Sequence, residues 1–146
     1  IYYDVDIDIA VLRISRTSSA GKTTSAFSTL ELVGTEDLRA GDVVYTLGNP
    51  LGLGLAVSSG VISDTARQVA RYDLPCLMDT ADISQGSSGG ALLNAYGQVI
   101  GVTSGAYSYG NNMYLAVPID PVLSADLSGE GWTLKEVRDI MAQYKD

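Results

Sequence analysis

The sequence predicts an all-β fold, and three observations support that prediction. Short runs of β-type residues follow one another at intervals of roughly 10–20 residues, each bounded by Gly, Pro, Asn or Asp. No helical pattern intervenes between these runs. Strands joined by tight turns favour an antiparallel barrel or a sandwich over a parallel sheet with crossover helices. The predicted strands are 43–50, 55–63, 74–80, 90–94, 98–105 and 112–118.

A further strand is predicted ahead of this set. Residues 5–14, VDIDIAVLRI, alternate charged and apolar side chains at a period of two, as a half-buried strand does. A polar, Ser- and Thr-rich connection at 15–29 separates it from the remaining strands. A lone strand needs neighbours for its backbone, so we expect a second sheet whose other strands lie outside this chain. The strand is therefore expected to be exposed and to pair with another chain.

The C-terminal segment has helical rather than strand periodicity. Thr133 followed by Glu136 predicts a capping box at the start of a helix. We expect its apolar face to pack on the strands, a groove for a partner being the alternative. The predicted units are 1–41 (first strand and linker), 42–124 (the six strands) and 125–146 (the helix). The apolar residues at helical spacing are Trp132, Leu134, Val137, Ile140, Met141 and Tyr144.

Composition excludes several classes of function. A hydrophobic content of 46% with 18% charged residues is typical of a folded domain. The net charge of −8 and scattered basic residues disfavour nucleic acid and anionic membranes as partners. Cys76 is the single cysteine, which excludes an internal disulfide and a Cys-based zinc site. The chain contains no histidine, so the commonest general base is missing, and no cofactor or metal is expected.

The glycine-rich stretch 86–90, GSSGG, is the principal candidate for chemistry. Its apolar, strand-like flanks disfavour a flexible linker, and the absence of a loop lysine and a following helix disfavours a phosphate loop. A G-x-S-x-G elbow also requires a following helix, whereas a strand, a turn and a strand follow here. A tight turn with Ser88 at its apex remains. Glycines let successive N–H groups converge beside the hydroxyl, an arrangement suited to acyl transfer.

Longer segments resemble one protease family. Residues 48–63 and 82–102 resemble the second barrel of trypsin-like serine peptidases, and most closely the bacterial HtrA/Deg branch. Residues 8–14 resemble the strand that carries the triad aspartate, and 115–120 resemble the end of the last barrel strand. The resemblance implies a chymotrypsin-like, six-stranded antiparallel second barrel, one strand left from the first barrel, and a C-terminal helix. Most of the first barrel is expected to lie outside this chain.

The resemblance also implies roles for individual residues. Ser88 is then the nucleophile, and Asp8 orients a histidine and stabilises its imidazolium form. The N–H groups of Gly86 and Ser88 form the oxyanion hole. The pocket for the residue before the scissile bond, together with the strand that pairs with substrate, comprises Asp82, Ile83, Thr103, Ser104 and Gly105.

Three departures from the family pattern shape the prediction. The family's histidine lies upstream of the aspartate, so the base is expected from sequence outside this chain, which alone is expected to be nearly inactive. Ser87 replaces the asparagine usual in the HtrA branch. Asp82 occupies the position of the acid that selects Lys or Arg in trypsin-type enzymes, where the HtrA branch has a small residue. It therefore either selects a basic side chain or, as we favour, is a surface carboxylate near the pocket.

The sequence accordingly predicts a serine endopeptidase that hydrolyses peptide bonds through an acyl-enzyme at Ser88. The alternative is a catalytically dead pseudo-protease or a peptide-binding module that uses the same strand edge. The expected partners are peptides or unfolded proteins, together with the missing N-terminal barrel or further copies of the chain. By resemblance, the expected setting is extracytoplasmic, in a bacterium.

Overall fold

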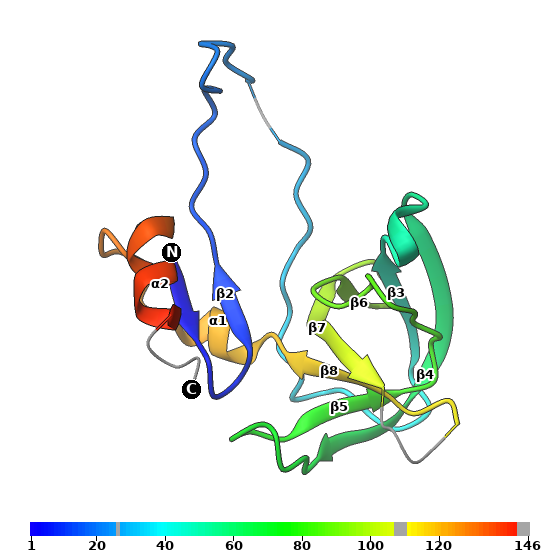
Figure 1. The fold of residues 1–146 in the computed structure, drawn as a ribbon. Coiled ribbons are helices and arrows are strands. Elements are labelled where there is room, and N and C mark those ends of the chain that lie inside the picture. Colours follow the sequence, from blue (N-terminus) through cyan, green and yellow to red (C-terminus); the bar gives the residue numbers. More distant parts are fainter. Residues whose placement is uncertain (26, 107–110, 143–146) are drawn as a thin grey trace.

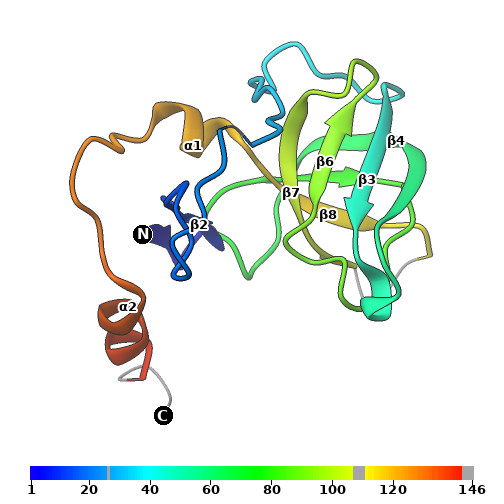
Figure 2. The same cartoon turned by 90° about the horizontal axis from the view of Figure 1, so that it is seen from above.

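The computed structural model describes residues 1–25, 27–106 and 111–142. Its main body is a closed antiparallel barrel with the strand order β3-β4-β5-β8-β7-β6 (Figures 1 and 2). The predicted six-stranded barrel is therefore confirmed. Its strands are β3 (Val43–Gly48), β4 (Ala56–Arg67), β5 (Cys76–Asp79), β6 (Ala91–Asn94), β7 (Val99–Ala106) and β8 (Tyr114–Pro118).

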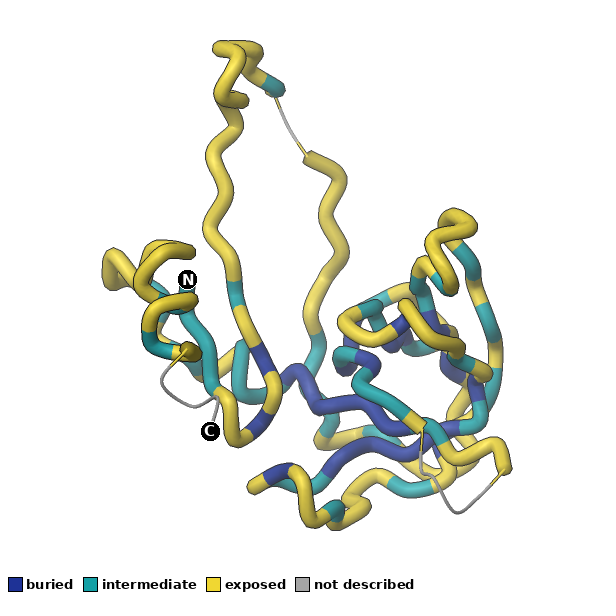
Figure 3. Tube along the Cα trace, viewed as in Figure 1, coloured by how far each residue is buried: buried dark blue, intermediate teal, exposed yellow. Residues whose placement is uncertain are grey.

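The barrel interior is filled by aliphatic side chains. Val44, Ile62, Leu77, Leu92 and Ile100 are each no more than 2% exposed and form one cluster. β5 is buried at all four positions because Tyr72 and Leu115 cover the outer side chains of Cys76 and Met78 (Figure 3). Burial on both faces explains why 74–80 reads as a continuous apolar run rather than an alternation.

Two glycines bring backbones into close approach beside the GSSGG loop. A Cβ on Gly60 would lie 2.2 Å from the amide nitrogen of Ala81, where the chain leaves β5. A Cβ on Gly90 would lie 2.1 Å from the carbonyl oxygen of Leu47. No larger residue fits either position without a shift of the backbone. These contacts seat both ends of the loop directly on the barrel wall.

The N-terminal segment differs from its prediction. β1 (Tyr2–Asp4) and β2 (Ile9–Val11) form a two-stranded antiparallel sheet, so the single strand predicted at 5–14 is wrong. The chain turns between them, with Asp8 at a left-handed φ of 57° and the Asp6 amide donating to Asp4 Oδ1 (3.0 Å). Aspartate tolerates the left-handed region and bonds to nearby backbone, so alternating acids suit a turn as well as a strand. β2 finds its pairing partner within the chain.

The two α-helices lie on the same side of the molecule as this sheet (Figures 1 and 2). A 3-10 turn, η1, spans Pro50–Gly52, and a short helix, α1 (Asp120–Ser124), follows β8. α2 (Leu134–Met141) begins with the predicted capping box, which is confirmed. Tyr144 lies outside the described residues, among which no helix has the length and apolarity needed to cross a membrane.

The position of α2 differs from its prediction. Leu134, Val137 and Met141 face β1 and β2, with which they line a pocket, rather than packing on the barrel. The preceding segment explains this placement, because the Trp132 amide donates to the Ile1 carbonyl (2.9 Å) and holds the chain along β1. The segment around Trp132 and α2 therefore lies against the N-terminal sheet. The unit boundary at residue 125 stays a prediction.

Candidate active site

The loop between β5 and β6 presents Ser88 at the surface. Its last part is a tight turn in which Ser87 N donates to Ser84 O (2.9 Å) and Gly90 N to Ser87 O (3.0 Å). Gly86 and Gly89 have φ values of 95° and 85°, which residues with a side chain rarely adopt. Ser87 is buried against Gly48, whereas Ser88 is exposed. Of the two adjacent serines, only Ser88 is open to an incoming substrate.

Thr103 holds this loop from inside the barrel. Its side chain is 2% exposed, and its hydroxyl donates to the carbonyls of Ser87 (2.7 Å) and Gly90 (3.1 Å). Its backbone accepts from Gly89 N (2.7 Å) and donates to Gly90 O (2.9 Å). The Thr103 side chain therefore supports the GSSGG loop and is not available to a substrate.

A β-bulge in β7 places Ser104 between the two predicted catalytic groups. Thr103 pairs with Ala116 and Gly105 with Leu115, so Ser104 has no partner residue on β8. Its carbonyl accepts the Ser88 hydroxyl (2.9 Å), while its own hydroxyl donates to Asp8 Oδ2 (3.2 Å). Hydrogen bonds thus connect Ser88 in the β5–β6 loop, through Ser104 in β7, to Asp8 in the β1–β2 turn.

Two further residues join this network and were missed by sequence reasoning. The hydroxyl of Tyr72 shares a hydrogen bond with that of Ser104. Arg71 lies 5.4 Å from the centroid of the Tyr72 ring and 4.0 Å from Asp8 Oδ2. Both belong to the β4–β5 connection, which carries no motif, so no local pattern identifies them. The Arg71–Asp8 pair is solvent-exposed, and such pairs contribute about 0–1 kcal/mol.

Free backbone donors lie next to Ser88. Within the described part of the chain, the amides of Gly86 and Ser88 donate to no protein acceptor. A Cβ on Gly86 would lie 3.0 Å from both Asn49 O and Leu51 N, so the loop packs tightly against η1. Two unpaired amides beside a serine hydroxyl are the elements of an oxyanion hole.

The predicted pocket residues flank the loop on two sides. Ile83 is partly buried, and Asp82 is exposed with its carboxylate accepting the Tyr114 hydroxyl. That hydrogen bond, with burial and the charges of Asp82 and Asp79, raises the pKa of Tyr114. A Cβ on Gly105, in β7, would meet no atom within 4 Å, so the space beside this residue is open.

The backbone edge of β7 beside Ser88 is also open. β6 pairs with β7 only as far as Val102, so among the described residues Gly105 and Ala106 have a strand partner on the β8 side alone, and Ser104, at the bulge, has none on either side. An edge with free backbone groups is a template for an added strand.

A buried carboxylate lies at the base of the same loop. Asp79 is 1% exposed, its Oδ1 accepts from Ala81 N (2.8 Å), and its Oδ2 has no hydrogen-bond partner. Burial raises the pKa of Asp79 to about 6, against the lowering effect of the Ala81 N–H. The sequence contained a signal for this residue, an acid in an otherwise apolar strand.

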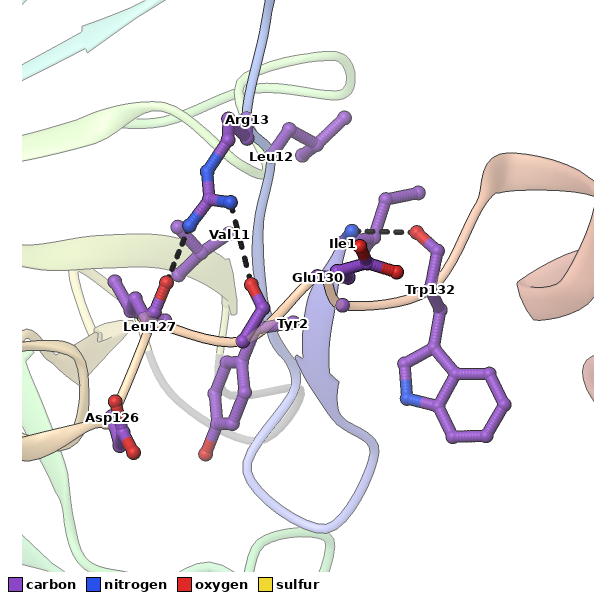
Figure 4. A pocket seen from close by; sticks show the side chains of 11 residues that line it. Ile1, Tyr2, Val11, Leu12, Arg13, Asp126, Leu127, Glu130 and Trp132 are labelled. Atoms are coloured by element: carbon purple, nitrogen blue, oxygen red, sulfur yellow. Dashed lines mark hydrogen bonds between the residues drawn. The ribbon is translucent and has the colours of Figure 1, made fainter.

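A separate pocket of about 330 Å³ lies between the β1–β2 sheet and residues 126–132 (Figure 4). There Arg13 donates to the carbonyls of Leu127 and Gly129, and the Ile1 amine donates to Trp132 O (2.6 Å). None of the predicted site residues lines it. In the described part of the chain, His, Cys, Asp and Glu side chains form no group able to hold a metal ion.

Comparison with known proteins identifies the class. The trypsin-like peptidase domain family matches residues 1–102, and the chain belongs to this family. It is 38% identical over 126 residues to the mitochondrial serine protease HTRA2 of Drosophila grimshawi, which covers 82% of this chain and 27% of that protein. A DegP-like periplasmic serine endoprotease of Halomonas elongata is 34% identical, over 80% of this chain and 24% of its own length.

Solved structures narrow the class to the HtrA type. The HtrA-type protease AlgW in complex with a decapeptide matches with a TM-score of 0.61 and 33% identity, over 64% of this chain and 30% of that protein. By these similarities the chain belongs to the HtrA type of the trypsin-like peptidase family. It spans about a quarter of the length of the curated relatives named above.

Proposed function

We propose that this chain carries the second barrel and the aspartate-bearing sheet of an HtrA-type serine endopeptidase. The observation that supports this most directly is the Ser104 bulge, which links Ser88 through its carbonyl and Asp8 through its hydroxyl. Ser88 attacks the scissile carbonyl, and the amides of Gly86 and Ser88 hold the oxyanion as it develops. The base takes the Ser88 proton and passes it to the leaving amine as the tetrahedral intermediate collapses and the peptide C–N bond breaks. The acyl-enzyme that remains is then hydrolysed by water, which releases the acid and restores the Ser88 hydroxyl.

The base in this proposal comes from sequence outside the chain. The 146 residues contain no histidine, and the Ser88 hydroxyl donates to a carbonyl, which takes no proton from it. The Asp8 side chain is half exposed, so its carboxylate is accessible to a group from outside the chain. Without that base Ser88 is a weak nucleophile, so the chain by itself is expected to be nearly inactive.

Substrate binding is proposed along β7. A peptide would add as a strand to the open edge from Ser104 to Ala106, with the residue before the scissile bond between Ile83 and Gly105. One oxygen of Asp82 is already engaged by Tyr114, which favours a carboxylate at the pocket rim. If Asp82 instead selects basic residues, Asp82→Ala would reduce cleavage after Lys or Arg and leave cleavage after Val unchanged.

Fluorophosphonate labelling of the full-length gene product tests the proposal. We expect label on the wild type, none on Ser88→Ala, and undiminished label on the control Ser84→Ala, a loop serine that contributes only its backbone carbonyl. Equal labelling of wild type and Ser88→Ala would exclude Ser88 as nucleophile. A full-length protein that takes no label but binds peptides would instead be the peptide-binding module.

Location and assembly are part of the proposal. Relatives include proteins named periplasmic, mitochondrial and chloroplastic, and we propose an extracytoplasmic setting for this one. Homo-oligomerisation and docking of an N-terminal barrel on the β1–β2 sheet stay predictions, which sedimentation of the full-length protein would check.

A further inference from the structure

Asp79 is the buried charged group for which the proposed reaction has no use. It ends β5 and is 1% exposed, and its Oδ2 meets no hydrogen-bond donor. Burying a carboxylate oxygen without a partner is costly, so such a group requires a compensating role. Its Oδ1 shows what the side chain does, because it accepts the amide of Ala81 at 2.8 Å.

The Asp79–Ala81 bond anchors the beginning of the nucleophile loop. From Gln85 onward the loop is held by other elements, through Leu51 N to Gln85 O (2.8 Å) and the bonds of Thr103. Before Gln85, Thr80 N donates to Val61 O and Val61 N donates to Thr80 Oγ1, each at 3.0 Å. The other links to the barrel in the described structure are the Asp79–Ala81 bond and two contacts of Asp82, a long one from Thr46 (3.4 Å) and one from Tyr114. The Asp79 bond is the shortest link to the backbone in this first part of the loop.

The backbone at Gly60 restricts the position of Ala81 from the other side. The backbone of β4 passes so close under Ala81 that a Cβ on Gly60 would lie 2.2 Å from the Ala81 nitrogen. Ala81 is 0% exposed, so its amide has no access to water in place of the carboxylate. The direction of the chain entering Asp82 and Ile83 is thus set between the Asp79 carboxylate on one side and β4 on the other.

We propose that Asp79 is a positioning residue: its ionised carboxylate holds the Ala81 backbone and thereby places Asp82 and Ile83 at the substrate pocket. The identity of that pocket rests on the proposed function, whereas the mechanical link between Asp79 and the loop does not. Asp79 itself is buried and touches no substrate.

The strength of this anchor depends on pH. The pKa of Asp79 is raised to about 6 by burial. The titratable groups around it are Tyr114, opposite it on β8, and Asp82 in the loop; Ile62, opposite it on β4, carries no charge. A hydrogen bond to an ionised acceptor is roughly twice as strong as one to a neutral acceptor. The 81–83 segment is therefore held more firmly above pH 6 than below it.

The chain contains a matched control for this bond. Asp64 Oδ1 accepts the Ala66 amide at 2.9 Å, the same Asp-x-Ala arrangement. Asp64 is partly exposed and paired with Arg67 at 2.9 Å. An effect specific to the buried anchor should therefore appear with Asp79→Asn and not with Asp64→Asn.

Amide NMR of the 146-residue chain between pH 5 and 8 tests the proposal. We expect the amides of Ala81, Asp82 and Ile83 to titrate together with a midpoint near pH 6 in wild type and Asp64→Asn. Asp79→Asn keeps an acceptor oxygen and should fold, but the titration should vanish. Amide chemical shifts at 81–83 that do not change with pH in the wild type would overturn the assignment of Asp79 as a positioning residue. An unchanged titration in Asp79→Asn would overturn it as well.

A second measurement separates this inference from the proposed function. Ser88→Ala should leave the titration of 81–83 unchanged, because the anchor does not involve the nucleophile. Hydrogen exchange at Ala81 should be at least about tenfold faster in Asp79→Ala than in wild type, since the amide loses its acceptor. Unchanged exchange at Ala81 in a folded Asp79→Ala protein would refute the anchor even if Ser88 proves to be the nucleophile.

Discussion

Stability should fall with rising pH through the titration of Asp79. The pKa of this carboxyl is about 6 in the folded chain, against an ordinary value of 3.8. Below pH 3.8 the group is protonated in both the folded and unfolded states and contributes no pH dependence. Between 3.8 and 6 the unfolded state loses its proton first, so folding is progressively disfavoured. Each pKa unit corresponds to about 1.4 kcal/mol, so the full loss above pH 6 is about 3 kcal/mol.

Urea denaturation monitored by circular dichroism measures the contribution of Asp79 to the free energy of unfolding. Other carboxylates also titrate in this range, so the informative quantity is the free energy of unfolding of Asp79→Asn minus that of wild type. We expect this difference to rise by about 3 kcal/mol between pH 3.5 and 7.5, because the asparagine remains neutral. Both pH values lie away from the isoelectric point near pH 4.3.

The control is Asp64→Asn, which neutralises a partly exposed aspartate in the same Asp-x-Ala arrangement and leaves Asp79 in place. The reasoning would be refuted if the free-energy difference between Asp79→Asn and wild type changed by less than about 0.5 kcal/mol between pH 3.5 and 7.5, or if it fell as pH rises. Such a result would mean that Asp79 is hydrated or paired in solution.

Three further substitutions probe the fold. Leu77→Ala removes a side chain that is 0% exposed in the barrel core and should cost about 2–5 kcal/mol of unfolding free energy; a loss below 1 kcal/mol in urea melts would contradict that packing. Gly60→Ala places a Cβ 2.2 Å from Ala81 N and should cost about 1–3 kcal/mol or more, with shifted amide resonances at 81–83; a neutral result would show that β4 yields easily. Thr133→Ala removes the α2 cap and should cost about 0.5–2 kcal/mol locally, seen as faster amide exchange in the helix but not in the barrel.

The six barrel strands could be predicted because their signals are local. Each predicted run is a few residues of β-forming side chains ended by a turn residue, and the strands β3 to β8 fall on those runs. Position 79 shows the limit of this reasoning. The acid in LMDT is visible in the sequence, but its burial follows from covering by neighbouring strands, which no local pattern describes.

The N-terminal segment and α2 show where local patterns are ambiguous. Alternating Asp and apolar residues fit a strand, yet Asp also favours turns, and the hairpin wins because β1 supplies a partner for β2. The capping box of α2 was predictable, since its two bonds join residues three apart. The surface against which α2 lies was not, because amphipathic spacing defines an apolar face without naming its partner.

The sequence by itself determined the six barrel strands, the GSSGG turn with Ser88 at its apex, and, through resemblance, the trypsin-like class. Tertiary structure alone decided that Ser104 bridges Ser88 and Asp8, that Tyr72 and Arg71 join them, and that Thr103 is buried. The physical reason is range. Turns and strand runs arise from neighbouring residues, whereas the Ser104–Asp8 bond joins positions 96 apart that meet only once the barrel has closed and the β1–β2 sheet has packed beside it.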